Sequence, residues 1–227
     1  EETKADPASR LANLQQSLYF LEKAAVYGSS ADATALHDQV QRQLDAIQGI
    51  VRIKMLPIAE NLNLGAVNIS QIAATNTDLY LLDDLSGRVL HFTLTGKGYL
   101  QDTAFDCGPN PENPNNEIGK IVDILAINSP NKHDATLLSI DGKGRIEYCI
   151  PSKSGVVGKL PAPDAAWKDL KAISLDQGTL HVLDAGRNAV YRYIGNGIEF
   201  PDPPRLYFDE DIPNLSKAVD IEANGDE

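Results

Sequence analysis

One sequence unit recurs along this chain and constrains its fold more than any other feature. Residues 78–92 read DLYLLDDLSGRVLHF, and residues 178–193 share the same layout. Each stretch has an apolar strand that ends in Leu-Asp, a tight turn that carries glycine, and a second strand with an aromatic residue. A third copy, ATLLSIDGKG followed by RIEYCI, spans residues 135–150. Such self-similarity is typical of architectures that repeat one supersecondary unit.

The spacing of these copies indicates four strands in each unit. The aspartates that close the second strands lie roughly 40–60 residues apart, which is close to the length of a four-stranded β-propeller blade. We expect first strands at 69–75, 121–127 and 170–176, fourth strands near 99–105 and 204–209, and one further first strand at 216–227. The predicted fold is mainly β, a partial β-propeller of about three and a half four-stranded blades preceded by an α-helical hairpin.

The turn residues have a structural explanation in the sequence. An aspartate at the mouth of a tight hairpin accepts hydrogen bonds from turn N–H groups, and the glycine or asparagine that follows supplies a positive φ. We therefore assign these residues to turn structure and not to catalysis: Asp83, Gly87, Asp141, Gly144, Asp184 and Asn188.

The chain before residue 54 has a helical period. Leucines recur every three or four residues from Leu11 to Leu21, and a second apolar stripe of this kind comprises Leu36, Val40, Leu44, Ile47 and Val51. Gly28 and Ser30 predict the end of one helix and the N-cap of the next. The predicted organisation is a disordered tail at 1–6, an antiparallel helical hairpin at 7–53, and propeller blades over 54–227, divided at about 54–110, 111–165, 166–213 and 214–227.

Three blades and one strand fall short of the roughly four to eight blades that close a propeller. An open stack exposes an apolar sheet face and an unpaired strand edge. We therefore expect the chain to be a fragment of a longer protein, or a second chain to complete the ring.

The charge balance argues against one class of partner. The chain has 32 acidic and 20 basic residues, a net charge of −12, which repels phosphate backbones, so we predict no nucleic acid partner. No apolar run is long enough to span a bilayer. The sequence has two cysteines, Cys107 and Cys149, which are either bonded to each other or two small buried hydrophobic residues.

Residues with catalytic potential do not form a recognisable motif. The four histidines lack metal-ligand spacing, and His91 and His181 fit cross-strand partners better than ligands. Loop 108–118 is rich in oxygen ligands but lacks the alternating spacing of a calcium loop. We predict no catalytic residue, metal or cofactor, and leave the ligand-binding residues unknown. A metal on the propeller axis would need polar residues at the starts of the inner strands, where the sequence offers Gln71, Asp123 and Lys171 or Lys217, a mixed set that makes a poor metal cage.

The repeats resemble those of NHL-type propellers. Residues 8–227 are similar to the C-terminal region of large membrane proteins found chiefly in the Chloroflexi. The similarity is carried by phrases such as YLLDDLSGRVLHFTLTGKGYLQDTAFDCGP and AISLDQGTLHVLDAGRNAVYRY. Those proteins carry a metal-dependent Ser/Thr phosphatase-like domain, a transmembrane helix, a helical spacer and an extracytoplasmic propeller. The resemblance implies an extracytoplasmic module, membrane-anchored through a part absent here, and makes a Cys107–Cys149 bridge plausible in an oxidising space.

We predict a non-catalytic binding or scaffold module that engages a protein, peptide or glycan. One alternative is a propeller enzyme, lactonase-like or lyase-like, with an axial metal. The other is an assembly subunit whose open propeller is completed by another chain.

Overall fold

The computed structural model describes residues 7–52, 64–112, 117–164 and 166–225. The chain divides into two compact units, Glu1–Pro57 and Ile58–Glu227. The disordered tail predicted at 1–6 and the boundary predicted at residues 53–54 lie outside the described residues.

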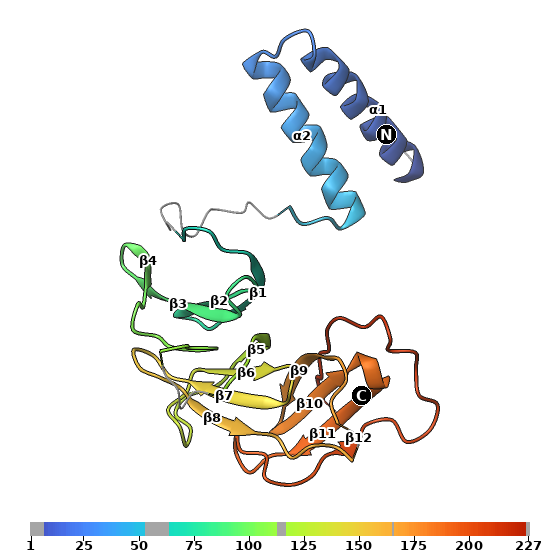
Figure 1. The fold of residues 1–227 in the computed structure, drawn as a ribbon. Coiled ribbons are helices and arrows are strands. Elements are labelled where there is room, and N and C mark those ends of the chain that lie inside the picture. The colour runs from blue at the N-terminus through green and yellow to red at the C-terminus, as the bar shows by residue number, and fades with distance from the viewer. Residues whose placement is uncertain (1–6, 53–63, 113–116, 165, 226–227) are drawn as a thin grey trace. The chain divides into compact units, whose positions relative to one another are not determined.

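The first unit contains two helices, α1 (Pro7–Ala25) and α2 (Ala31–Gln48), which contact each other (Figure 1). Ser30 caps α2, since its hydroxyl accepts a hydrogen bond from the N–H of Ala33 at 3.2 Å. Val40 and Leu44 are buried. The predicted stripe was too wide, because the other three of its members are exposed: Leu36, Ile47 and Val51. Contact with one neighbouring helix covers only a narrow part of a helix surface.

The second unit contains three four-stranded antiparallel sheets, and the prediction of a mainly β chain is confirmed. Within each sheet the strands are adjacent in chain order. The first sheet comprises β1 (Ile69–Ala74), β2 (Asp78–Asp83), β3 (Arg88–Thr95) and β4 (Gly98–Gln101). The second comprises β5 (Ile121–Ala126), β6 (Leu137–Asp141), β7 (Arg145–Cys149) and β8 (Val156–Lys159). The third comprises β9 (Leu170–Asp176), β10 (Thr179–Asp184), β11 (Ala189–Ile194) and β12 (Arg205–Leu206).

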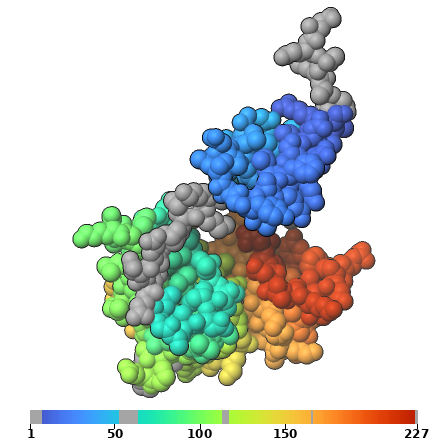
Figure 2. Space-filling model, turned by 90° about the horizontal axis from the view of Figure 1, so that it is seen from above, coloured from blue at the N-terminus to red at the C-terminus, as the bar shows by residue number. Residues whose placement is uncertain are grey.

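Apolar clusters lie between successive sheets. Tyr80 and Leu82 of the first sheet pack with Ile124 and Leu137 of the second. Leu138 of the second sheet packs with Ile173 and Leu180 of the third in a larger cluster. The strands β1, β5 and β9 are neighbours in space, and the sheets follow one another in chain order from green through yellow to orange (Figure 2). The faces of the sheets therefore bury one another.

The strand predictions were wrong in three places. Strand β8 was not predicted, because the residues VVGK show no clear alternation of apolar and polar side chains. The fourth strand predicted at 204–209 shrinks to the two residues of β12. The first strand predicted at 216–227 is not formed within the described residues 216–225. That stretch instead lies on the far face of the third sheet, where Ala218 and Ile221 pack against an apolar cluster.

Candidate functional site

The turn aspartates each hold two parts of the chain together. Asp184 is fully buried and accepts hydrogen bonds from the N–H groups of Lys168 (2.9 Å), Asp169 (2.9 Å) and Arg187 (3.0 Å). The first two precede β9 and the third lies in the turn after β10. Asp83 and Asp141 repeat this pattern, with N–H donors from Asn68 and Gly119 before the first strand and from their own turns. The aspartates therefore fasten the first strand of each sheet as well as the turn.

The residues that follow these aspartates adopt the predicted positive φ. The values are 68° at Gly87, 74° at Gly144 and 56° at Asn188. At Gly144 a side chain is also excluded by space, because the indole of Trp167 lies where a Cβ would stand. Trp167 packs on the cluster between the second and third sheets and contacts the ring of Tyr191 edge-on at 5.4 Å.

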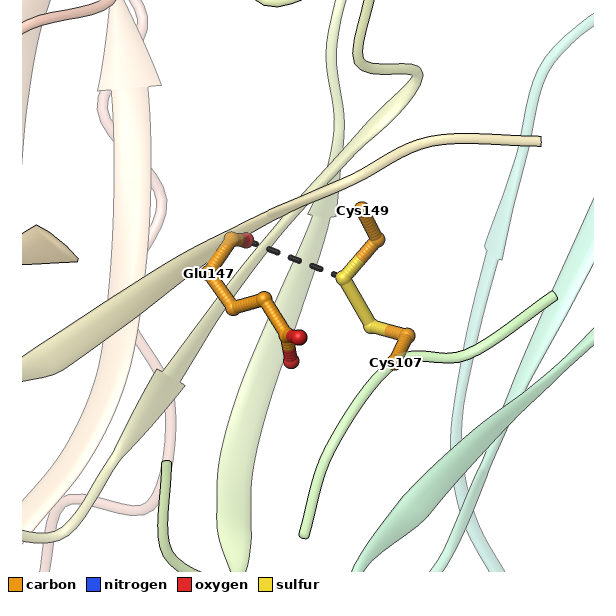
Figure 3. A group of neighbouring side chains, drawn as sticks. All are labelled: Cys107, Glu147 and Cys149. Atoms are coloured by element: carbon orange, nitrogen blue, oxygen red, sulfur yellow. Dashed lines mark hydrogen bonds between the residues drawn. A yellow bond between two sulfur atoms is a disulfide. The ribbon is translucent and has the colours of Figure 1, made fainter. Parts of the chain in front are cut away.

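The two cysteines form a disulfide with an S–S distance of 2.01 Å (Figure 3). Cys107 follows the first sheet and Cys149 ends β7, and both are fully buried. The buried carboxylate of Glu147 lies near the two sulfurs and accepts a hydrogen bond from the N–H of Gly108 at 2.7 Å. In the disulfide form the sulfurs offer no thiolate to a metal, so this grouping acts as a covalent and hydrogen-bonded junction between two sheets.

Two of the four predicted axial candidates lie together on the inner strands. Gln71 of β1 donates from Nε2 to the carbonyl of Val122 in β5 at 3.2 Å. Asp123 of β5 accepts from the N–H of Ile124 at 2.8 Å and from the N–H of Ile173 in β9 at 2.6 Å. Each of these side chains therefore ties its strand to the next inner strand. Both line a cavity of about 300 Å³.

The structure adds Asp220 to this cavity and leaves the two lysines out. Asp220 and Glu222 line it from the C-terminal segment. Lys171 instead forms an ion pair with Asp169 at 2.8 Å, and neither Lys171 nor Lys217 lines the cavity. The sequence repeats Val-Asp-Ile at 122–124 and 219–221, and this signal would have identified Asp220.

The side chain of Asp123 is a weaker acid than an ordinary aspartate. Burial and, to a smaller extent, the charge of Asp220 raise its pKa to about 6, against the lowering effect of hydrogen bonds from the N–H groups of Ile173 and Ile124. Since both carboxylate oxygens already accept backbone hydrogen bonds, the geometry of Asp123 is that of a structural tie rather than of a free general base.

The stability of the second unit is therefore expected to rise as the pH falls from about 7 to about 5. A raised pKa means that the folded state binds the proton more tightly than the unfolded chain. The stabilisation is present below a pH of about 4 and is lost as the pH rises through about 6. A shift from 3.8 to about 6 corresponds to about 3 kcal/mol. Urea unfolding across this range should show the pH dependence in the wild type and lose most of it in Asp123→Asn, but keep it in the surface control Asp202→Asn. Parallel profiles for wild type and Asp123→Asn would contradict the assignment.

His91 lies between two carboxylates, as a cross-strand partner. Its Nε2 is 2.8 Å from Asp78 and its Nδ1 is 3.2 Å from Asp102, and its ring stacks on Tyr80. Asp102 also accepts from the N–H of Ser152, in the connection between β7 and β8 of the second sheet, at 2.7 Å. Burial acts to raise the pKa of Asp102, but the hydrogen bonds from Ser152 and His91 lower it overall. The group joins the first two sheets.

A pocket on the far face of the third sheet is a different kind of site. Ser174, His181 and Arg192 stand directly opposite one another on β9, β10 and β11. The same three positions form a row across each of the other two sheets, and these rows lie beneath the next sheet. The row is Ala73, Tyr80 and His91 in the first sheet, and Leu125, Leu138 and Tyr148 in the second, so it is mostly apolar or aromatic. The third row is wholly polar. Its members His181 and Arg192 line a cavity of about 500 Å³ together with Asp176, Thr179 and Tyr207, whereas the hydroxyl of Ser174 accepts from the N–H of Ala223 at 2.9 Å. We call this cavity the third-sheet pocket.

A second chamber of about 230 Å³ adjoins the third-sheet pocket. The two share His181, Tyr207 and Gly225. The side chains of Val190, Phe208 and Ile221 make part of the smaller chamber apolar. The whole site is therefore polar at one end and apolar at the other.

His181 is the least satisfied polar group of this pocket. Its side chain is only 7% exposed, and its Nδ1 has no hydrogen-bond partner in the described structure. Burial lowers its pKa, the charge of Arg192 adds to this, and a hydrogen bond to the backbone of Ser174 opposes it. At neutral pH the ring is therefore uncharged. The uncharged ring has one nitrogen that can accept a hydrogen bond.

This pocket was not predicted from the sequence, where His181 taken alone fits a cross-strand partner. The polar row Ser174, His181 and Arg192 could have been found by comparing the three repeats position by position.

Comparisons with known proteins assign no family to this chain. No family model and no curated protein matches it. Among solved structures it is similar to Myxococcus xanthus glutaminyl cyclase, at 13% identity over 58% of this chain and 50% of that chain, with a TM-score of 0.39. It is also similar to a catalytically inactive virginiamycin B lyase from Staphylococcus aureus, at 19% identity over 64% of this chain and 43% of that chain, with a TM-score of 0.41. A third similar structure is apo AztD from Citrobacter koseri, at 10% identity over 59% of this chain and 47% of that chain, with a TM-score of 0.30. The chain spans about half the length of these proteins, and similarities of this size transfer no activity.

Proposed function

We propose that this chain is a non-catalytic binding module, in which three four-stranded blades of a β-propeller, preceded by a helical hairpin, present a ligand site on the third sheet. Three face-packed four-stranded sheets with adjacent first strands support the propeller arrangement. The observation that carries the binding role is the third-sheet pocket. A buried histidine whose Nδ1 has no hydrogen-bond partner in the described structure, beside a large cavity, favours a bound ligand, because unsatisfied buried polar atoms are costly.

An extracytoplasmic location is part of this proposal. The buried Cys107–Cys149 disulfide supports an oxidising compartment, where such bonds persist. The resemblance to the propeller region of Chloroflexi membrane proteins points the same way. Within the described ranges, no helix has both the length and the apolarity needed to cross a bilayer.

The enzyme alternative depends on the inner-strand cavity. Gln71, Asp123 and Asp220 bring oxygen atoms together there, as an axial metal would require. However, Asp123 uses both oxygens for the N–H groups of Ile124 and Ile173. A stoichiometric metal in the purified protein, measured by elemental analysis, would favour this alternative over a binding module.

The assembly alternative has one specific observation in its favour. Asp220 accepts from the N–H of Ile221 at 2.8 Å, just as Asp123 accepts from Ile124. The second oxygen of Asp123 reaches the next inner strand, whereas the second oxygen of Asp220 has no partner within the described residues. A further strand would supply that partner. Sedimentation at several concentrations would detect self-association through this segment.

The binding function predicts ligands whose retention depends on the third-sheet pocket. The labelled protein should be applied to peptide and glycan arrays alongside the variants His181→Phe and Arg192→Gln, with Arg10→Gln in the first unit as the matched control. We expect a set of array features to bind the wild type and Arg10→Gln but not the two pocket variants. Arrays with no specific binding, or with binding that both pocket variants retain, would contradict the proposal.

A further inference from the structure

The third-sheet pocket contains a cation without a carboxylate partner. Among the described ion pairs of this acidic chain none involves Arg192, whose guanidinium lies over the ring of Tyr207 at 5.3 Å. A planar guanidinium held against an aromatic face presents a fixed set of N–H donors that fits the two oxygens of a carboxylate. The pocket can therefore bind a ligand carboxylate without displacing an existing ion pair.

His181 and two acidic side chains favour a donor group beside that carboxylate. Because His181 and Arg192 are directly opposite on neighbouring strands, their Cβ atoms are about 5 Å apart. Nδ1 of His181 has no hydrogen-bond partner in the described structure, and the uncharged ring can accept one hydrogen bond from an N–H donor. Asp176 lines the larger chamber and Glu222 the smaller one. Asp176 accepts one hydrogen bond, from the N–H of Gly225, through Oδ2 at 3.1 Å. The two negative charges of Asp176 and Glu222 outnumber the single positive charge of Arg192 and favour a cationic hydrogen-bond donor over a neutral one.

The smaller chamber indicates which further chemical group the ligand carries beside its carboxylate and its donor group. Its volume of about 230 Å³ and its apolar residues Val190, Phe208 and Ile221 suit an aliphatic or aromatic side chain. Burial of such a side chain contributes to binding through the hydrophobic effect. One small molecule class has a carboxylate, an ammonium group and an apolar side chain on a single carbon atom.

We propose that the third-sheet pocket binds a free α-amino acid with an apolar side chain. Arg192 binds the carboxylate, the ammonium group donates to Nδ1 of His181 and faces Asp176 and Glu222, and the side chain enters the chamber beside Val190 and Phe208. This inference uses the same pocket as the proposed function but goes beyond it, since it names a small-molecule ligand.

Isothermal titration calorimetry with L-leucine tests the proposal directly. We expect saturable binding of L-leucine. L-leucinamide, which lacks the carboxylate, and N-acetyl-L-leucine, which lacks the ammonium group, should each bind about tenfold or more weakly. These ligand comparisons use the unaltered protein, so they do not depend on the folding of any variant. No heat of binding up to about 10 mM L-leucine, or equal affinity for the three compounds, would overturn the inference.

Two variants locate the binding. Arg192→Gln, at an exposed position, and His181→Phe should each weaken L-leucine binding about tenfold or more, while Arg10→Gln should bind as the wild type does. A thermal unfolding curve for each variant checks that it is folded. Undiminished binding by a folded Arg192→Gln would place the amino acid elsewhere and overturn the assignment. If L-leucine does not bind, but binding to the array ligands is still lost in the two pocket variants, the proposed binding function stands and only the ligand class is wrong.

Discussion

Replacing Asp184 by alanine is expected to lower the free energy of unfolding by about 3 kcal/mol. The substitution leaves three backbone N–H groups without their carboxylate, those of Lys168, Asp169 and Arg187. Some of this loss is recovered by water, because Lys168 and Asp169 lie near the surface. Both the turn after β10 and the start of β9 lose their attachment, so the whole third sheet is weakened.

Urea unfolding followed by tryptophan fluorescence measures this loss, because Trp167 packs on the third sheet. Asp184→Asn keeps one acceptor oxygen and should lose less than Asp184→Ala. The exposed Asp202→Ala is the matched control and should change stability by less than about 0.5 kcal/mol. If Asp184→Ala and Asp202→Ala unfold at the same urea concentration, Asp184 does not hold the two segments together.

Removing the disulfide is expected to have the largest effect. Cys107 and Cys149 are 42 residues apart in the sequence, and the loss of a cross-link of that span corresponds to about 4 kcal/mol in the chain-entropy account. The double variant Cys107→Ala/Cys149→Ala should therefore unfold at a much lower denaturant concentration than the oxidised wild type.

Reduction provides the control for this prediction. A reducing agent should shift the wild type to the unfolding curve of the double variant and leave the double variant unchanged. A wild type that is equally stable with and without the reducing agent would show that the cross-link contributes little to the folded state.

The sheets could be predicted from the sequence because their signals are local. The alternation in β2 and β10, the Leu-Asp endings and the glycine or asparagine after each turn all depend on neighbours within a few residues. The strand that was missed, β8, has only four residues and carries no such pattern. The segment at 216–225 has a strand-like sequence, but the structure shows no backbone ladder that would make it a strand.

The site was harder to predict because it depends on register between strands. Gln71 and Asp123 were identified as inner-strand candidates, yet their bonds to Val122 and Ile173 join residues about 50 positions apart. The pocket around His181 and Arg192 depends on which residues of β10 and β11 stand opposite each other. A period of two places a residue on one face of a strand but does not say what lies above that face.

The disulfide has a consequence for how the chain tolerates cleavage. The Asn- and Pro-rich stretch 108–118 lies between Cys107 and Cys149 in the sequence, together with β5, β6 and most of β7. A protease that cuts once inside this stretch therefore yields two polypeptides that stay joined through sulfur. The covalent link between the pieces is broken only when a thiol reductant is added, so the disulfide keeps a nicked protein in one covalent molecule.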